Sequence, residues 1–423
     1  MNPRYSHSRD LTNRTRLVTP GGAQTMSKRP DRFTEGAFPA YLERGLGARV
    51  WDVDGNCYVD WICGLGAISL GYNHKGVWQR VTDALSQGLL SPSLPTRLEE
   101  WVASHLVRII PCAGTGGQVR FVKTGSEACQ AAVRIARRYT ERDLVIVVGY
   151  HGWHDWVQVT SPSHPGIPEC YAGGYDDGWE RPAIVRVPYN DAHLIESLMR
   201  RHKVAAVMLE PTLLTPPNDK YLETVVGLCT LHGAVSIFDE TVMGFRWARA
   251  GGQEFFNVTP NMAVYGKALA NGLPLACVVG PGYMMKNADV ISGTFGGETL
   301  SLAAALAVLD AYSDTHPHDG PIGRQWRHGT YFMELCRGLG IPVTGYAVHP
   351  KVTYEGEDMA RFLQETAKRG VLLHPGGFNV SAALTPDDLE VTYMALNGAK
   401  DAVDAKVPLE GAMPQEGILK RLA

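Results

Sequence analysis

The alternation of short apolar runs with amphipathic stretches over residues 118–279 is the feature that most constrains the fold of this chain. Runs such as LVIVVG, VAAVMLEP and AVSIFDE are short and rich in β-branched residues, as buried strands are. Stretches with helical periodicity, including SEACQAAVRIARRY and YLETVVGLCTLHG, lie between them. This repeated strand–helix–strand order favours an α/β fold with a mostly parallel sheet, helices on both faces and ligands at the strand ends.

Two charged residues follow strands in the centre of this pattern. Asp239 closes the run AVSIFD, and Lys267 follows the run MAVYG. An acid and a lysine at neighbouring strand ends can face one ligand from two sides. Pyridoxal phosphate (PLP) needs such a pair, because its aldehyde forms a Schiff base with a lysine and a carboxylate keeps its ring nitrogen protonated. We assign Lys267 to the aldehyde and Asp239 to the ring nitrogen, in preference to a solvated lysine and a turn acid.

The residues around this pair also resemble a known family. IFDETVMGFR followed by YGKALANGLPLACVVG is similar to the signature of the class III (fold type I) PLP-dependent aminotransferases, in the branch of glutamate-1-semialdehyde aminomutase. The similarity extends from about Thr19 to about Asp388. It implies a large, mostly parallel seven-stranded sheet domain and a smaller α+β domain. We place an N-terminal arm and small-domain segment at 1–50, the large PLP-binding domain at 51–312 and the C-terminal small domain at 313–423.

The stretch VRFVKTGSEACQ places a tight glycine turn between a strand and a helix. The first N–H groups of a helix are unpaired and carry partial positive charge, so they bind anions. The resemblance places the cofactor phosphate here, on Gly125 and Ser126. Ordinary N-capping by Ser126 or Thr124 is the alternative.

The resemblance also implies roles for residues after two other strands. Tyr150 matches an aromatic residue that stacks on the cofactor ring. Glu210 matches a glutamate near the ring hydroxyl, although a turn acid fits the sequence equally well. His151 and His154 are expected to make structural hydrogen bonds, because no carboxylate accompanies them in the manner of HExxH. We therefore expect no metal.

The segment ISGTFGGETLSL predicts a contribution from a second subunit. Thr294 matches a family threonine that reaches the phosphate of the neighbouring subunit, which implies a homodimer with shared active sites. N-capping of the next helix by Thr294 is the alternative. The family pattern contains an asparagine and a proline, where this chain has GGET, a variant associated with relatives that act on sugars. Residues 161–182, rich in Gly, Pro and aromatic residues, are expected to cover the cleft and to influence substrate choice.

Two further residues are assigned to the substrate. Residues 1–18 are polar and arginine-rich, which is typical of a mobile arm. In the aminomutase, an arginine of this arm recognises the substrate carboxylate. In this chain Lys28 stands near the place of that arginine, and a lysine lacks the bidentate fork of an arginine. Trp61 follows a predicted hairpin with its turn at Asp54–Gly55, and we place it near the substrate.

Composition excludes several other classes of protein. The net charge of −3 and pI of about 6.5 do not suggest a nucleic-acid or membrane-surface partner. Eight cysteines occur without a CxxC pair, which favours a reducing compartment. The N-terminus has no apolar core of a signal peptide, and no apolar run approaches the roughly 20 residues of a membrane span. We therefore expect a cytoplasmic enzyme.

These observations predict an aminotransferase that moves an amino group from an amino-acid donor to a carbonyl acceptor. Lys28, GGET and the covering segment favour an oxidised sugar as acceptor, as in aminotransferases of aminoglycoside antibiotic biosynthesis. An isomerase with the same site residues, either an aminomutase or an amino-sugar epimerase, is the alternative. A non-catalytic ligand sensor is disfavoured, because Lys267 is present and no DNA-binding segment is.

Overall fold

The computed structural model describes residues 3–158, 184–212, 214–313 and 319–415. The chain forms two compact units. One combines Met1–Lys75 with Thr315–Lys420, and the other spans Gly76–Asp314. No helix within the described ranges combines the length and the apolar character that crossing a bilayer requires.

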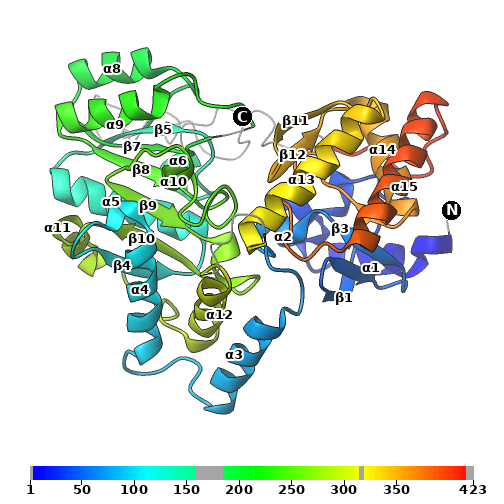
Figure 1. Cartoon of the computed structure of the whole chain (residues 1–423), viewed down its shortest axis with the longest axis horizontal. Coiled ribbons are helices and arrows are strands. Elements are labelled where there is room, and N and C mark those ends of the chain that lie inside the picture. Colours follow the sequence, from blue (N-terminus) through cyan, green and yellow to red (C-terminus); the bar gives the residue numbers. More distant parts are fainter. Residues whose placement is uncertain (1–2, 159–183, 213, 314–318, 416–423) are drawn as a thin grey trace. The chain divides into compact units, whose positions relative to one another are not determined.

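The second unit is built on a seven-stranded sheet with the order β4-β10-β9-β8-β7-β5-β6 (Figure 1). Its strands are β4 (Gln118–Val122), β5 (Leu144–Val148), β6 (Ile184–Arg186), β7 (Val204–Leu209), β8 (Val235–Asp239), β9 (Met262–Tyr265) and β10 (Ala276–Gly280). Strands β5 to β9 are parallel, whereas β10 runs antiparallel to both β4 and β9. Two reversals bring β4 back to the direction of β9. The expected mostly parallel sheet of fold type I is confirmed.

Helices cover both faces of this sheet, because the strands are apolar on both sides. Alternate residues of β5 point to opposite faces: Val145 and Val147 pack in the cluster with α5 (Gly125–Thr140) and α11 (Gly282–Met285). Ile146 and Val148 pack in the cluster with α8 (Ala192–Arg201) and α9 (Tyr221–His232). The unit also contains α3 (Lys75–Ser86), α4 (Arg97–Ile109), α6 (Asp155–Gln158), α10 (Gly252–Phe255) and α12 (Thr299–Ala311).

The first unit contains a four-stranded sheet with the order β1-β2-β3-β13. Its strands are β1 (Leu42–Leu46), β2 (Arg49–Asp52), β3 (Cys57–Asp60) and β13 (Val371–Leu372). The predicted hairpin is confirmed as the antiparallel pair β2–β3, and β13 pairs with β3 in parallel. Residues 51–75 thus belong to the same unit as the C-terminal part of the chain, and the observed boundary follows Lys75 and not residue 50 as predicted. Strands β3 and β13 lie some 300 residues apart in sequence, so no pattern in the neighbouring residues of either strand indicates that they pair.

Helices and a second hairpin complete the first unit: α1 (Ser6–Arg16), α2 (Cys63–Gly66), α13 (Pro321–Gly338), β11 (Val343–Tyr346), β12 (His349–Val352), α14 (Gly356–Lys368) and α15 (Pro386–Asp404). Residues 6–16, predicted to be part of a mobile arm, form helix α1. Its first N–H groups, those of His7 and Ser8, donate to the carboxylate of Asp54 at 2.7 and 3.0 Å. This acid caps the helix from the hairpin turn, so the sequence next to α1 shows no cap.

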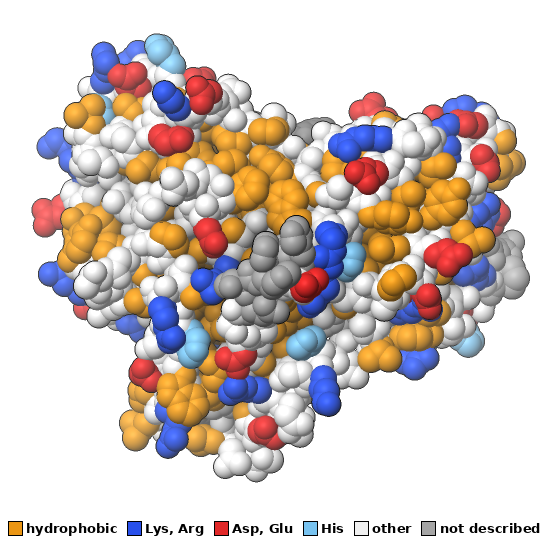
Figure 2. Space-filling model, viewed as in Figure 1, with side chains coloured by type: hydrophobic (Ala, Val, Ile, Leu, Met, Phe, Trp, Pro, Cys, Tyr) orange, Lys and Arg blue, Asp and Glu red, His pale blue; other side chains and the backbone are white. Residues whose placement is uncertain are grey.

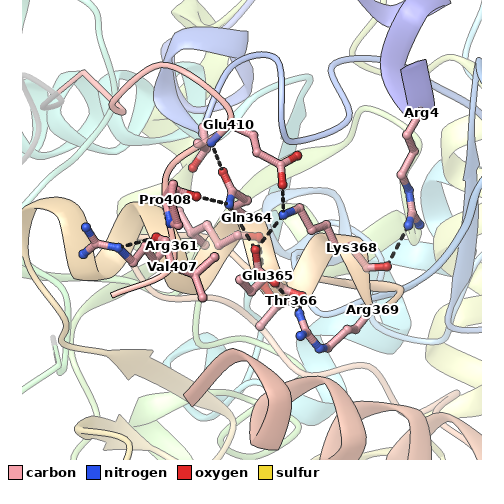
Figure 3. A network of polar contacts seen from close by, with 12 residues as sticks. Arg4, Arg361, Gln364, Glu365, Thr366, Lys368, Arg369, Val407, Pro408 and Glu410 are labelled. Carbon is pink, nitrogen blue, oxygen red and sulfur yellow. Dashed lines mark hydrogen bonds and ion pairs between the residues drawn. The ribbon is translucent and has the colours of Figure 1, made fainter. Parts of the chain in front are cut away.

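A buried carboxylate, Glu365 of α14, is the centre of a polar network in the first unit (Figure 3). It accepts hydrogen bonds from Lys368 at 2.7 Å, Arg369 at 2.5 Å and Gln364 at 3.0 Å. Burial alone would raise the pKa of Glu365, but these donors outweigh burial and lower it. Lys368 and Gln364 also bond Glu410, which attaches the chain after α15 to α14.

We predict that Glu365→Gln lowers the free energy of unfolding by about 2 kcal/mol at pH 7, the scale of hydrogen bonds to a charged group. Because the folded-state pKa is lowered, this stabilisation is complete above the unfolded pKa of about 4.3 and disappears as the pH falls through the folded value. Urea unfolding between pH 3 and 7 measures both effects. Glu357→Gln, on the same helix but largely exposed, is the matched control and should change stability by less than about 0.5 kcal/mol. Equal effects of the two substitutions would contradict the prediction.

Candidate active site

The carboxyl ends of four parallel strands bring the predicted site residues to one edge of the seven-stranded sheet. Tyr150 follows β5, Glu210 follows β7, Asp239 ends β8 and Lys267 follows β9. Parallel strands in adjacent positions end at the same edge, so these side chains gather there. All of them belong to the second unit.

Asp239 is buried and is held by donors from several elements. Its Oδ2 atom lies 2.8 Å from Nδ1 of His151 and 3.3 Å from the thiol of Cys129, which donates to it. Its Oδ1 atom accepts the backbone N–H of Thr241 at 3.1 Å. Burial alone would raise the pKa of Asp239, but the His151 and Thr241 contacts outweigh burial and lower it. Asp239 is therefore ionised at neutral pH and fixed in orientation.

Lys267 is strained in its backbone and partly buried. Its φ of +42° lies in the left-handed region, a backbone conformation that residues with a Cβ atom rarely adopt. Burial lowers the pKa of its amine, although the nearby carboxylates of Asp239 and Glu210 oppose the change. A lysine with a lowered pKa is a better nucleophile and proton acceptor near neutral pH than a surface lysine.

Glu210 and Tyr150 are joined by one hydrogen bond. The backbone N–H of Tyr150 donates to the Glu210 carboxylate at 3.3 Å. Burial, followed by the charge of Asp239, raises the pKa of Glu210 to about 7. The side chain of Tyr150 remains 40% exposed, so its ring is available to a ligand. Because Glu210 lies among the charges of Asp239, His151 and Lys267, it is part of this site and not an isolated turn acid.

The glycine turn before α5 leaves two N–H groups available for an anion. Thr124 is the N-cap, and its hydroxyl accepts from Glu127 N while the Glu127 carboxylate accepts from Thr124 N. Among the described residues, none accepts from the backbone N–H of Gly125 or Ser126. Capping by Ser126, the alternative expected from sequence, is thus wrong, and capping by Thr124 coexists with an open anion site.

The backbone at two other glycines, Gly266 and Gly152, lies close to this turn. An ideal Cβ on Gly266, directly before Lys267, would lie 3.8 Å from Cα of Gly125 and 3.3 Å from Cγ2 of Thr241. A Cβ on Gly152, directly after His151, would lie 2.4 Å from Oγ of Ser126. The glycine turn therefore lies beside two other segments. One is the turn that carries Lys267, and the other is the loop after β5 that carries His151, called the histidine loop below.

Thr294 does not join this cluster within one chain. It is exposed and lines a cavity of about 390 Å³ with residues of β4, α5 and the 290–296 loop. It does not cap α12, because the N-cap is Glu298, whose carboxylate accepts from Leu300 N and Ser301 N. Glu298 also pairs with Lys123 at 2.8 Å. The acid of the GGET variant therefore has a structural role inside this unit.

The two predicted substrate residues, Lys28 and Trp61, lie in the first unit. Trp61 is fully buried, its ring packs against Phe332 and Phe378, and its indole N–H donates to Thr392 at 3.0 Å. The Trp61 side chain, which was placed near the substrate from sequence, thus belongs to the core of its unit. Lys28 is exposed at the end of a short 3-10 helix, Met26–Lys28. The predicted covering segment 161–182 lies outside the described residues.

Cys129 and Thr241 were missed as partners of Asp239. Cys129 lies among the buried apolar residues of α5 and looks like a core residue in sequence. Thr241 follows the strand end by two residues, where an acid often accepts a backbone N–H. His151 was expected to make a structural hydrogen bond, and it does so to Asp239 and to the carbonyl of Val148.

Comparison with known proteins agrees with this geometry. Residues 33–319 match the family model of class III aminotransferases. The glutamate-1-semialdehyde 2,1-aminomutase of Desulforapulum autotrophicum is 31% identical, over 85% of this chain and 91% of that protein. The 3-aminobutyryl-CoA aminotransferase of Cloacimonas acidaminovorans is 31% identical, over 84% and 85% of the two chains. The chain belongs to the class III aminotransferase family, and its relatives are enzymes.

Solved structures give the same fold. The PLP internal aldimine form of the FumI protein from Sphingopyxis sp. MTA144 has a TM-score of 0.83 and 26% identity, covering 94% of this chain and 97% of that one. PLP is therefore the cofactor. The residues present fit it, because a fixed carboxylate, a lysine of lowered pKa and a helix start with two available N–H groups lie within one unit.

We predict that Gly152→Ala weakens PLP binding at least about tenfold, roughly 1.4 kcal/mol. The new Cβ would overlap Oγ of Ser126, and the φ of +98° strains any residue with a side chain. Fluorescence titration of the cofactor-free chain with PLP measures the dissociation constant. Gly227→Ala on α9 is the control, because its Cβ would meet no atom within 4 Å. Unchanged affinity in Gly152→Ala would show that the contact between the histidine loop and the glycine turn does not shape the site.

Proposed function

We propose that this chain is a PLP-dependent aminotransferase that transfers an amino group from an amino-acid donor to a carbonyl acceptor. The observation that carries the proposal is the gathering of an ionised Asp239 and a Lys267 of lowered pKa at adjacent strand ends. When bound, the cofactor supplies the reactive aldehyde and an electron-accepting ring.

Each residue of the site has a distinct proposed role. Asp239 holds the proton on the ring nitrogen, and His151 keeps that carboxylate ionised and oriented. Lys267 holds the cofactor and then, once released, moves the proton at the substrate α-carbon. The N–H groups of Gly125 and Ser126 bind the phosphate, Tyr150 covers one face of the ring and excludes water, and Glu210 lies on the hydroxyl side of the ring. These roles agree with the burial and the hydrogen bonds described above.

An oxidised sugar, as in aminoglycoside antibiotic biosynthesis, is the acceptor that we propose. Lys28 supports it, because a lysine near the place of the family arginine lacks the bidentate fork that recognises a substrate carboxylate, which argues against an α-carboxylate substrate. The GGET variant no longer adds support, since the Glu298 carboxylate caps α12 and pairs with Lys123.

An aminomutase or an epimerase acting at the same site is the second candidate. A specific observation favours the aminomutase, because several relatives about 31% identical over most of the chain carry the name glutamate-1-semialdehyde 2,1-aminomutase. The site residues would be the same for both reactions.

A half-reaction separates these candidates. We predict that the PLP-loaded enzyme, given L-glutamate or L-alanine alone, releases about one keto acid per subunit and loses the visible absorbance of its lysine-bound cofactor. Lys267→Ala should slow this step at least about 100-fold, because it lacks the proton-moving amine, whereas Lys286→Ala, at an exposed site, should not. Conversion of glutamate-1-semialdehyde without a second substrate, and without any keto acid from the donors, would contradict transfer and favour the aminomutase.

We also propose a homodimer with shared active sites. Thr294 and Phe295 are exposed, and the Thr299 amide and hydroxyl at the start of α12 bond the carbonyls of Leu90 and Leu89. This places exposed apolar side chains, those of Leu89, Leu90 and Phe295, around the Thr294 loop. Figure 2 shows apolar side chains gathered in the region where Figure 1 places the chain between α3 and α4. Exposed apolar surface of this kind is typical of an interface.

We predict that Phe295→Asp shifts the protein from dimer to monomer in sedimentation-velocity measurements, because a charge would be buried in the interface. The control is Leu231→Asp on α9, where an equally apolar side chain is 77% exposed outside this surface. Sedimentation of Phe295→Asp as wild-type dimer, or dissociation of both variants alike, would contradict the proposed interface.

The cytoplasm remains the proposed location. None of the seven described cysteines is in a disulfide, as expected in a reducing compartment. The proposed partners are small molecules, the amine donor and the carbonyl acceptor, with no nucleic acid and no membrane.

A further inference from the structure

Three side chains with metal-binding atoms meet at Asp239, within the candidate active site. The Sγ atom of Cys129, a ring nitrogen of His151 and a carboxylate oxygen of Asp239 all lie within 4.8 Å of one another, and all three residues are buried. They come from α5, from the loop after β5 and from the end of β8. Among the described residues, this is the one group of at least three such side chains that converges in this way.

The orientation of His151 leaves one ring nitrogen facing the other two groups. Its Nε2 lies 3.0 Å from the carbonyl of Val148 and donates to it. Histidines that bind metals usually donate their other ring N–H to a carbonyl or carboxylate, which fixes the ring. Nδ1 then faces Oδ2 of Asp239 at 2.8 Å. Two lone pairs cannot face each other at this distance, so a cation, either a proton or a metal ion, must lie between them.

Two of the three separations between these atoms are near those around a tetrahedral ion, and the third is at most 4.8 Å. With bonds of about 2.0 Å to nitrogen or oxygen and about 2.3 Å to sulfur, zinc ligand atoms lie roughly 3.3–3.6 Å apart. The Sγ–Oδ2 separation is 3.3 Å, and the Nδ1–Oδ2 separation of 2.8 Å needs only a small opening. Three protein ligands leave a fourth position for water.

We propose that Cys129, His151 and Asp239 form a binding site for one thiophilic divalent cation, Zn²⁺ or Cd²⁺, in the cofactor-free chain. The cation replaces two protons, one from the Cys129 thiol and one from the His151 ring, and both leave to solvent. A thiolate, a carboxylate and a neutral imidazole then balance the two positive charges. Neutrality makes a dicationic centre acceptable in a buried site, where an uncompensated charge would be costly.

This site makes metal and cofactor mutually exclusive, a consequence that rests on the proposed function. Asp239 is the residue assigned to the ring nitrogen of PLP. A carboxylate that coordinates a metal ion no longer stabilises the proton on that nitrogen. The metal therefore acts as a competitor that retains the protein in a cofactor-free, inactive form until a chelator removes it.

Titration of the cofactor-free full-length chain with Cd²⁺ tests the proposal, read by the ultraviolet charge-transfer band of a cadmium–thiolate bond and by equilibrium dialysis. We expect one tight Cd²⁺ per chain with a thiolate band. Cys129→Ser should abolish this band and weaken binding at least about tenfold. The same change at Cys229, a fully buried thiol in α9 away from the cluster, should alter neither. Asp239→Asn is a second variant, and thermal melting of each variant checks that it folds.

The proposal is overturned if wild type binds no tight Cd²⁺, or if Cys129→Ser binds it as wild type does. The PLP-loaded enzyme provides a separate arm, in which we expect no tight Cd²⁺ binding. Tight binding that persists at saturating PLP and still requires Cys129 would support the metal site and would instead contradict the assignment of Asp239 to the ring nitrogen. The failures of the two proposals are thus distinguishable.

Discussion

The buried carboxylate of Asp239 is the constraint on which the rest of the site depends. An ionised carboxylate away from water is unstable unless cations and hydrogen-bond donors surround it. Here the donors come from the loop after β5, from α5 and from the residues after β8. Satisfying this one group therefore fixes the positions of three segments at the edge of the sheet, including the histidine loop that carries Tyr150 and Gly152.

The negative charge of Asp239 also shifts the pKa values of the neighbouring ionisable groups. Asp239 opposes the lowering of the Lys267 pKa by burial, and it adds to the rise in the pKa of Glu210 to about 7. Two acids and one lysine thus share a small region, and their protonation states are interdependent. An arrangement in which one acid is ionised and the other is near neutrality is typical of sites that move protons.

Much of the fold, and the position of Asp239 and Lys267 at neighbouring strand ends, could be predicted from sequence, because these features leave local patterns. β-Branched runs and helical periodicity identified the sheet, and charged residues after strands identified the edge at which the candidate site lies. The unpredicted features depend on contacts distant in sequence: Asp54 caps α1, β13 pairs with β3, and Cys129 reaches Asp239 from another element. The core position of Trp61 was not predicted, because a tryptophan after a strand can face either a core or a ligand, and sequence does not distinguish the two.

A crystal structure of the PLP-loaded enzyme would test the central claim most directly. We predict continuous density between Nζ of Lys267 and the aldehyde carbon, and a ring nitrogen within about 2.8 Å of the Asp239 carboxylate. Cofactor bound to a different lysine, or a ring nitrogen that faces a group other than Asp239, would contradict the account.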